Sequence, residues 1–186
     1  MRKIFNQEKF NNIPTHNGIK HCPPGDYTAI EKFENCRFEK GCRFGNGCTF
    51  TACSFDDNCT FGASNTFYEF TGKGTHFGAG CRFDARCRFG DNCQLEDNSC
   101  VGVQAHFGEN CYVGTGSSVG SYAQAGRKFL ASQGCKFGTN CDFSRNCKFL
   151  KGCSFDYECT FGHYTEFGEK AEFGDNCLFG HNCTRW

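Results

Sequence analysis

The sequence predicts an all-β fold, a single-domain parallel β-helix with an irregular N-terminal cap. The chain of 186 residues contains 23 Phe, 24 Gly and 18 Cys but only 3 Pro, which is the length of one domain with a strongly biased composition. Cysteines recur every six residues from Cys135 to Cys159, and the stretch from Phe77 to Thr184 divides into eighteen hexapeptides without an insertion. A fixed short period of this kind indicates a repeat architecture.

Each hexapeptide predicts one short strand followed by a corner. Position one is apolar in every repeat and position five is small in nearly all of them. In a Cys-x-Phe strand these two side chains point inward and the residue between them points outward. Position two is mostly Gly and position four is often Asn or Gly, residue types that tolerate a positive φ. Three strands then close a triangle of about 18 residues per coil, with about eight coils in all.

One irregular repeat supports the inward placement of both positions. In AGRKFL, Ala125 takes the site of the large residue and Phe129 takes the site of the small one. This exchange roughly conserves volume if both side chains point into the same core.

The repeats FGAGCR, FDARCR and FGDNCQ resemble the hexapeptide repeat of left-handed parallel β-helices, over roughly Phe38 to Thr184. The resemblance implies a left-handed, triangular coil, although Phe stands where that family usually has Leu, Ile or Val. The unit FTACS is interpreted as a one-residue deletion rather than as part of a pentapeptide-repeat helix. The stretch FYEFTGKGTH has ten residues where twelve would fit and indicates an imperfect coil or a small protruding loop. The Cys-Phe-Gly repeats also resemble those of uncharacterised phage and bacterial repeat proteins.

The two ends of the predicted solenoid differ. Residues 1–34 lie outside the lattice and are predicted to form the N-terminal cap, and residues 35–186 form the hexapeptide-repeat solenoid. A cap is needed because a terminal coil exposes both its core and an unpaired strand edge. At the other end, Trp186 is a candidate cover for the last coil.

The cysteine spacing favours thiols over disulfides or zinc ligands. The chain contains no CxxC pair, and parallel in-register cysteines rarely reach the dihedral angle that a disulfide needs. Free Cys packs as a compact hydrophobic residue, so we interpret the lattice cysteines as core residues in a reducing cytoplasm. Cys100 falls at an outward position and Cys22 lies in the cap segment. These two are candidate reactive thiols, with simple exposure as the alternative.

Charge and hydropathy exclude several partners and compartments. The 20 Lys and Arg balance 20 Asp and Glu, and a formal charge of zero makes nucleic acid an unfavourable partner. No stretch reaches the length of a membrane span, and the first twenty residues contain no apolar run of seven or more. We therefore expect a cytoplasmic protein with no signal peptide, no transmembrane segment and no membrane partner.

The candidate partner-binding residues come from two surface features. Residues eighteen positions apart should stack, so one outward column changes from acidic to basic and could set the polarity of a partner contact. Its members are Asp91, Glu109, Arg127, Arg145, His163 and His181. The second feature is a set of apolar and aromatic candidates for contact hot spots. Tyr112 and Leu130 should stack on one face, whereas Tyr157, Tyr164, Leu178 and Trp186 gather toward the C-terminal end.

His163 and His181 are also weak candidates for metal ligands, because γ-class carbonic anhydrases of the resembled fold bind a metal through histidines of neighbouring coils. Two ligands do not make a site, and we favour a solvent-exposed ladder. No catalytic residue and no cofactor are predicted.

The main functional hypothesis is a non-catalytic rigid solenoid that acts through protein–protein contacts. The partner is either the chain itself, as a trimer or end to end, or another macromolecule. By analogy with the phage proteins, the chain could inhibit a host enzyme. The first alternative is a hexapeptide-type acyltransferase or a metal-dependent enzyme at a trimer interface. It is disfavoured because the repeats from Phe77 to Thr184 contain no catalytic loop excursion. The second alternative is a filament joined through the C-terminal coil.

Overall fold

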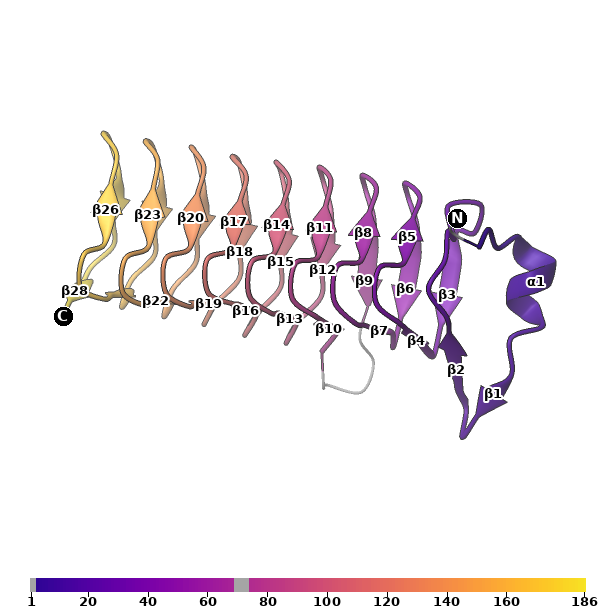
Figure 1. Ribbon diagram of the computed structural model, residues 1–186. Helices are drawn as coiled ribbons and strands as arrows, with labels where there is room; N and C mark the ends of the chain where they lie inside the picture. Colours follow the sequence, from indigo (N-terminus) through magenta and orange to yellow (C-terminus); the bar gives the residue numbers. More distant parts are fainter. Residues whose placement is uncertain (1–2, 69–73) are drawn as a thin grey trace.

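In the computed structural model, which describes residues 3–68 and 74–186, nearly all regular structure is parallel β-strand wound into a rod (Figure 1). Strands follow one another around the rod, and each strand inside a sheet pairs with the strands one coil before and one coil after it. Arg88 pairs with His106 and His106 pairs with Gln124, so one coil takes about 18 residues. The predicted all-β parallel solenoid is confirmed, with about nine turns instead of about eight.

The strands of the described residues form three sheets, which are the three sides of the rod. The eight-stranded sheet contains β5 (Arg43–Phe44), β8 (Thr60–Phe61), β11 (Arg82–Phe83), β14 (Cys100–Val101), β17 (Ser118–Val119), β20 (Lys136–Phe137), β23 (Ser154–Phe155) and β26 (Glu172–Phe173). The nine-stranded sheet contains β3 (Lys32–Glu34), β6 (Thr49–Thr51), β9 (Thr66–Tyr68), β12 (Arg88–Phe89), β15 (His106–Phe107), β18 (Gln124–Ala125), β21 (Asp142–Phe143), β24 (Thr160–Phe161) and β27 (Leu178–Phe179). The eleven-stranded sheet contains β1 (Thr15–His16), β2 (Ile19–Cys22), β4 (Cys36–Phe38), β7 (Ser54–Phe55), β10 (His76–Phe77), β13 (Gln94–Leu95), β16 (Tyr112–Val113), β19 (Leu130–Ala131), β22 (Lys148–Phe149), β25 (Glu166–Phe167) and β28 (Thr184–Arg185).

Corners between the sheets need the residue types that the repeat supplies. Asn110, at position four, has a φ of 55°, a left-handed conformation that Asn adopts more readily than most residues. Gly126, at position two, has no such φ but lies against the preceding coil. A Cβ atom on it would come within 2.6 Å of the Gly108 carbonyl oxygen. Asn110 and Gly126 therefore suit the corner for different reasons. Position four requires a positive φ here, whereas position two leaves no room for a Cβ atom.

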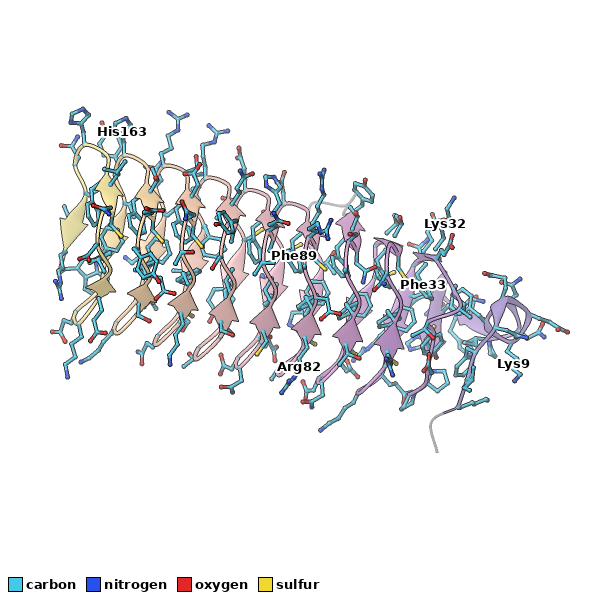
Figure 2. The ribbon with its side chains drawn as sticks, turned by 90° about the horizontal axis from the view of Figure 1, so that it is seen from above. Lys9, Lys32, Phe33, Arg82, Phe89 and His163 are labelled. Atoms are coloured by element: carbon cyan, nitrogen blue, oxygen red, sulfur yellow. The ribbon has the colours of Figure 1, made fainter. Side chains whose placement is uncertain are left out.

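The core is built from columns of Phe side chains. Phe143 stacks on Phe161 of the next coil, with ring centroids 5.3 Å apart, and meets Phe149 of its own coil edge to face at 4.8 Å. Figure 2 shows Phe33 and Phe89 inside the rod, whereas Lys32, Arg82 and His163 project from it. These two ring geometries are the ones that aromatic pairs prefer, so Phe columns suit a triangular coil of this size.

The predicted exchange in the AGRKFL repeat is confirmed. Ala125 and Phe129 are both buried, and the Phe129 ring is 1% exposed. Its centroid lies 5.3 Å from that of Phe107 and 6.2 Å from that of Phe149. The ring at the small position thus fills core space beside the alanine.

The N-terminal end is closed by α1 (Gln7–Asn11) and by β1, which pairs antiparallel with β2. The Asn6 side chain caps α1 by accepting a hydrogen bond from the Lys9 backbone. Phe5 stacks on Tyr27 at 4.5 Å, and Phe10 packs edge to face on Phe33 at 5.3 Å. Within the described residues, no helix is long and apolar enough to cross a membrane. Parallel pairing already begins inside this segment, since β2 pairs with β4 and β3 pairs with β6.

Several register changes interrupt the lattice before Phe77, and one of them precedes FTACS, since Lys32 pairs with Thr49 one residue short of a regular coil. Thr49 pairs with Thr66, one residue short of a regular coil, which confirms that FTACS is a one-residue deletion. Thr66 in turn pairs with Arg88, so the next coil is longer than a regular one. The coil that contains the stretch from Phe67 to His76 is therefore irregular in length, as the expectation of an imperfect coil or a small protruding loop requires. Residues 69–73 of this stretch lie outside the described residues.

Candidate protein-interaction surface

The nine-stranded sheet and the corners on either side of it carry most of the predicted partner-binding residues. We call the turns between the eight- and nine-stranded sheets the upstream corner, and the turns between the nine- and eleven-stranded sheets the downstream corner. The nine-stranded face is defined as the outward residues of that sheet, such as His106, Gln124 and Asp142, together with both corners. Because each coil adds one residue to every column, side chains gather here from coils that are far apart in sequence.

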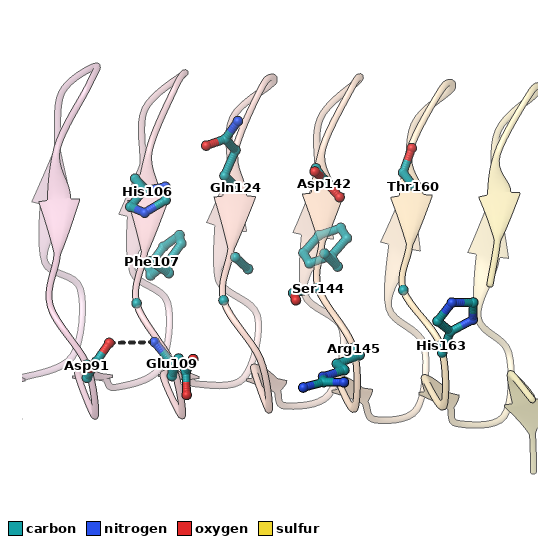
Figure 3. Close-up of a pocket in the computed structure, with 15 residues that line it drawn as sticks. Asp91, His106, Phe107, Glu109, Gln124, Asp142, Ser144, Arg145, Thr160 and His163 are labelled. Atoms are coloured by element: carbon teal, nitrogen blue, oxygen red, sulfur yellow. Dashed lines mark hydrogen bonds between the residues drawn. The ribbon is translucent and has the colours of Figure 1, made fainter. Parts of the chain in front are cut away.

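The predicted acidic-to-basic column lies on the downstream corner. The Glu109 backbone nitrogen donates a hydrogen bond of 2.7 Å to Asp91 Oδ1 (Figure 3). Arg127 donates to Glu109 Oε1 from Nε at 2.9 Å and from Nη2 at 2.6 Å. Lys128 and Arg145 are exposed and make no ion pair with any described residue. The acidic and basic halves therefore neutralise each other only where they meet.

His163 and His181 continue this column toward the C-terminal end. Their rings are stacked with centroids 5.1 Å apart, and the His181 backbone nitrogen donates a 2.7 Å hydrogen bond to His163 Nδ1. That nitrogen is therefore already occupied as an acceptor. Across residues 3–68 and 74–186, no three His, Cys, Asp or Glu side chains are grouped closely enough to hold a metal ion. Both side chains are exposed and stack as neighbours in the ladder along this corner.

An open groove of about 700 Å³ runs between the nine-stranded sheet and the downstream corner. His106, Gln124 and Asp142 line it from the sheet, and Arg145 and His163 line it from the corner (Figure 3). Its polar side chains lie along the rod, one or two per coil, and do not converge on one point. A groove of this form suits an extended protein contact better than a small enclosed ligand.

The upstream corner also carries charges, which sequence reasoning missed. Asp84 and Arg86 lie on it and Arg88 follows on β12 itself. All three are exposed, and neither arginine makes an ion pair with a described residue. Farther along, Asp156 and Glu158 are exposed, and Glu158 accepts a 3.0 Å hydrogen bond from the Asn140 amide. This corner is therefore balanced beside β12 and acidic farther along the rod. Reading positions two and four as well as position three along the repeats would have revealed the acidic end.

Three of the four residues expected to gather near the C-terminal end do surround the nine-stranded sheet. Tyr157 lies on the upstream corner and is 57% exposed, Tyr164 lies on the downstream corner and is 58% exposed, and Leu178 lies on the sheet between them. Val103 and Tyr122, which the sequence analysis did not select, are also exposed on the upstream corner. The result is one face with several uncovered apolar groups.

The other apolar candidates lie on the eleven-stranded sheet. Tyr112 and Leu130 are neighbours in β16 and β19 and are both half-buried. Trp186 is 54% exposed, and the Lys148 ammonium lies 5.0 Å from its ring centroid. Trp186 therefore packs outside the rod instead of covering the last coil, where Phe179 remains 48% exposed.

The two candidate reactive thiols have opposite environments. Cys22 is completely buried, and a hydrogen bond with the Cys36 thiol, together with burial, raises its pKa. Cys100 is exposed on β14, between Arg82 and Ser118 of the adjacent strands. Since a reagent must reach the sulfur, Cys100 is the accessible candidate.

Comparisons of the chain with protein-family models, with curated proteins and with solved structures find no match. The resemblance to hexapeptide repeats and to phage proteins therefore depends on the repeat pattern itself.

Proposed function

We propose that this protein is a non-catalytic rigid β-solenoid that acts through protein–protein contacts made by its nine-stranded face. The observation that carries the proposal is the gathering on that one face of exposed Tyr side chains, exposed Leu178 and Arg side chains that make no ion pair with a described residue. Tyr and Arg are the residue types that most often dominate binding energy in protein interfaces. The polar groups on the face are spread along ladders, an arrangement that suits contact more than catalysis.

Rigidity supports the same proposal. Each strand inside a sheet pairs with both neighbours through short backbone hydrogen bonds, such as His106 to Cys87 at 3.0 Å and Gln124 to Ala105 at 2.9 Å. A surface held in this way loses little conformational entropy when a partner binds, so more of its contact energy appears as affinity.

The face is also large enough for a specific contact. Its nine strands, at about 4.8 Å spacing, extend over roughly 40 Å, and one side of the coil is about 15 to 20 Å wide. One copy thus offers roughly 600 to 800 Å² to a partner, which approaches the usual contribution of one side of a stable complex.

The compartment that suits this function is a reducing one, such as the cytoplasm. All 18 cysteines lie within the described residues as thiols, and most of them are buried in the core, where they pack as small apolar residues. Inhibition of a host enzyme by a phage-encoded chain is the form of the proposal that the resemblance alone supports.

A photo-crosslinking amino acid placed on each side of the rod tests the proposal. Gln124 on β18 represents the nine-stranded face, and Lys136 on β20 and Gln94 on β13 are matched controls on the other two sheets; all three side chains are exposed. In the cells that naturally express the chain, we expect protein adducts from position 124 and few from the controls. Equal adducts from all three positions, or none, would contradict the proposal. Zinc retained after dialysis, or stabilisation by an acyl-CoA, would favour the enzyme alternative.

A further inference from the structure

We propose that the partner seated on the nine-stranded face is a second copy of this chain, packed face to face with its rod antiparallel to the first. This inference rests on the proposed function and specifies its partner. Its basis is the order of charges on the downstream corner, where acidic Asp91 and Glu109 are followed by basic Arg127 and Arg145, one in each coil. A row of charges that changes sign at its middle is complementary to its own reverse.

A two-fold axis that crosses the rod between β15 and β18 brings this row against its reverse. The axis lies in the interface at a right angle to the rod, so each corner faces the same corner of the second copy with its direction reversed. Arg145 of each copy then lies opposite Asp91 of the other. Glu109 and Arg127, already joined by an ion pair of 2.6 Å, meet the same two residues of the second copy. Four charges of alternating sign therefore gather at the axis.

The sheet carries a further pair of charges with the same symmetry. Arg88 on β12 and Asp142 on β21 lie at equal distances from the axis, each one coil beyond the central strands β15 and β18. Both side chains are exposed, and neither makes an ion pair with a described residue. In the antiparallel pair, Arg88 of each copy lies opposite Asp142 of the other, so the second copy supplies an opposite charge to both.

Other two-fold arrangements of this face bring like charges together. An axis along the rod makes the two copies parallel and sets Arg88 against Arg88. Moving the crossing axis by half a coil sets Glu109 against Glu109 in one direction and Arg127 against Arg127 in the other. Because like charges across an interface repel, the charges select both the antiparallel direction and this one register.

Apolar groups lie beside the same axis. Val103 and Tyr122, on the upstream corner of the coils that contain β15 and β18, are 45% and 57% exposed. The axis sets Val103 of each copy against Tyr122 of the other, where both side chains lose contact with water. Five strands of the sheet precede the axis and four follow it. Almost the whole face therefore overlaps with its copy, and the buried area approaches what a stable complex requires.

The groove between the sheet and the downstream corner leaves room for long side chains of the second copy. It is open, about 700 Å³ in volume, and lined by Asp91, Asp142 and Arg145 (Figure 3). Arg88 and Arg145 of the second copy approach the two carboxylates from the opposite side. A guanidinium can bind a carboxylate through two parallel hydrogen bonds, so these contacts fix the direction of the pair as well as adding affinity.

A charge-swap experiment on the full chain tests the pair. Light scattering under reducing conditions, over a concentration series, should show the wild-type chain reaching the mass of a dimer and no more. Arg88→Glu and Asp142→Lys each set like charges against each other at two symmetry-related contacts, and each alone should weaken the dimer at least about 10-fold. An equimolar mixture of the two variants should restore the dimer, because both contacts in the mixed pair are again attractive. Lys136→Glu and Glu172→Lys, exposed on the eight-stranded sheet, are matched controls and should leave the dimer unchanged.

Unfolding temperatures show whether each variant is folded. Where a single variant is unstable, the double variant Arg88→Glu with Asp142→Lys takes its place and should again form a dimer with itself. A wild-type monomer at every concentration would overturn the inference, and so would a trimer or a mass that grows without limit. Full restoration of Arg88→Glu by the wild-type chain, and not by Asp142→Lys, would overturn the antiparallel arrangement, because only parallel copies set position 88 against itself. If a monomer forms adducts with a different protein from position 124, the proposed function survives without this partner.

Discussion

The exchange of Ala125 and Phe129 predicts a strong energetic coupling between two core positions. Phe129→Cys removes a ring that is 1% exposed. At about 200 Å² of buried ring surface and about 25 cal/mol per Å², its burial contributes up to roughly 5 kcal/mol. The cysteine retains part of that burial, so we expect a loss of about 3 to 4 kcal/mol in the free energy of unfolding. Ala125→Phe alone overfills the core beside the Phe129 ring and should cost about 1 to 3 kcal/mol.

The double variant should recover most of this loss. Phe at position 125 would enter the column between Phe107 and Phe143, with which Ala125 is in register. We expect the double variant to lie within about 1.5 kcal/mol of the wild type, which gives a coupling energy above about 2 kcal/mol. As a control, Phe129→Cys combined with Ala171→Phe should be additive, because position 171 lies more than two coils farther along the rod.

Urea unfolding followed by far-UV circular dichroism measures these free energies, and the single variant Phe129→Cys should lower the unfolding temperature by roughly 6 to 16 °C. If the double variant is as unstable as the sum of its two single variants, the two side chains do not share core space and the inward placement is refuted.

Three further predictions concern thiols and corners. At pH 8, a maleimide should modify Cys100 rapidly and the buried core thiols only after unfolding, as measured by mass spectrometry; early modification of core thiols would contradict their packing. Burial raises the pKa of Cys48, Cys87 and Cys147 to about 11 from the ordinary 9.0. Their neutral forms therefore stabilise the fold fully below pH 9, and this contribution is lost as the pH rises toward 11. Between pH 9 and pH 11 the free energy of unfolding should fall by about 1.4 kcal/mol per pH unit for each thiol. Equal free energies of unfolding at pH 8 and pH 10.5 would contradict the raised pKa values. Gly126→Ala should cost about 1 to 3 kcal/mol in urea unfolding, because its Cβ would lie 2.6 Å from a carbonyl oxygen, and a neutral substitution would show that the coils can separate there.

The regular part of the fold could be predicted from the sequence because two periodicities, one along each strand and one from coil to coil, determine where each residue lies. Side chains alternate along each strand, and a coil of constant length places each residue beside its equivalent in the next coil. These two rules correctly paired Tyr112 with Leu130 and stacked His163 on His181. The Ala125 and Phe129 exchange was predictable for the same reason, since both positions point to a shared core.

The irregular parts could not be predicted in the same way. Cys22 is buried because β2 pairs with β4 at a step shorter than a regular coil. The 18-residue period does not predict this shorter step. Trp186 lies beside Lys148 because the chain has turned past its last inward position, where Arg185 pairs with Phe167. Finding the acidic end of the upstream corner requires knowing that positions two and four project along the same edge as position three. These features depend on local backbone geometry outside the periodic pattern.

Oxidative footprinting of surface tyrosines tests the central claim most directly, namely that the nine-stranded face is covered by protein when the chain functions. Tyr122, Tyr157 and Tyr164 are 57%, 57% and 58% exposed in the isolated rod, and Tyr112 on the eleven-stranded sheet provides an internal reference. In cells that naturally express the chain, we expect oxidation of these three tyrosines, relative to Tyr112, to fall well below that of the dilute purified protein. Equal relative oxidation in the two samples would mean that the face is open to solvent, and would contradict the account.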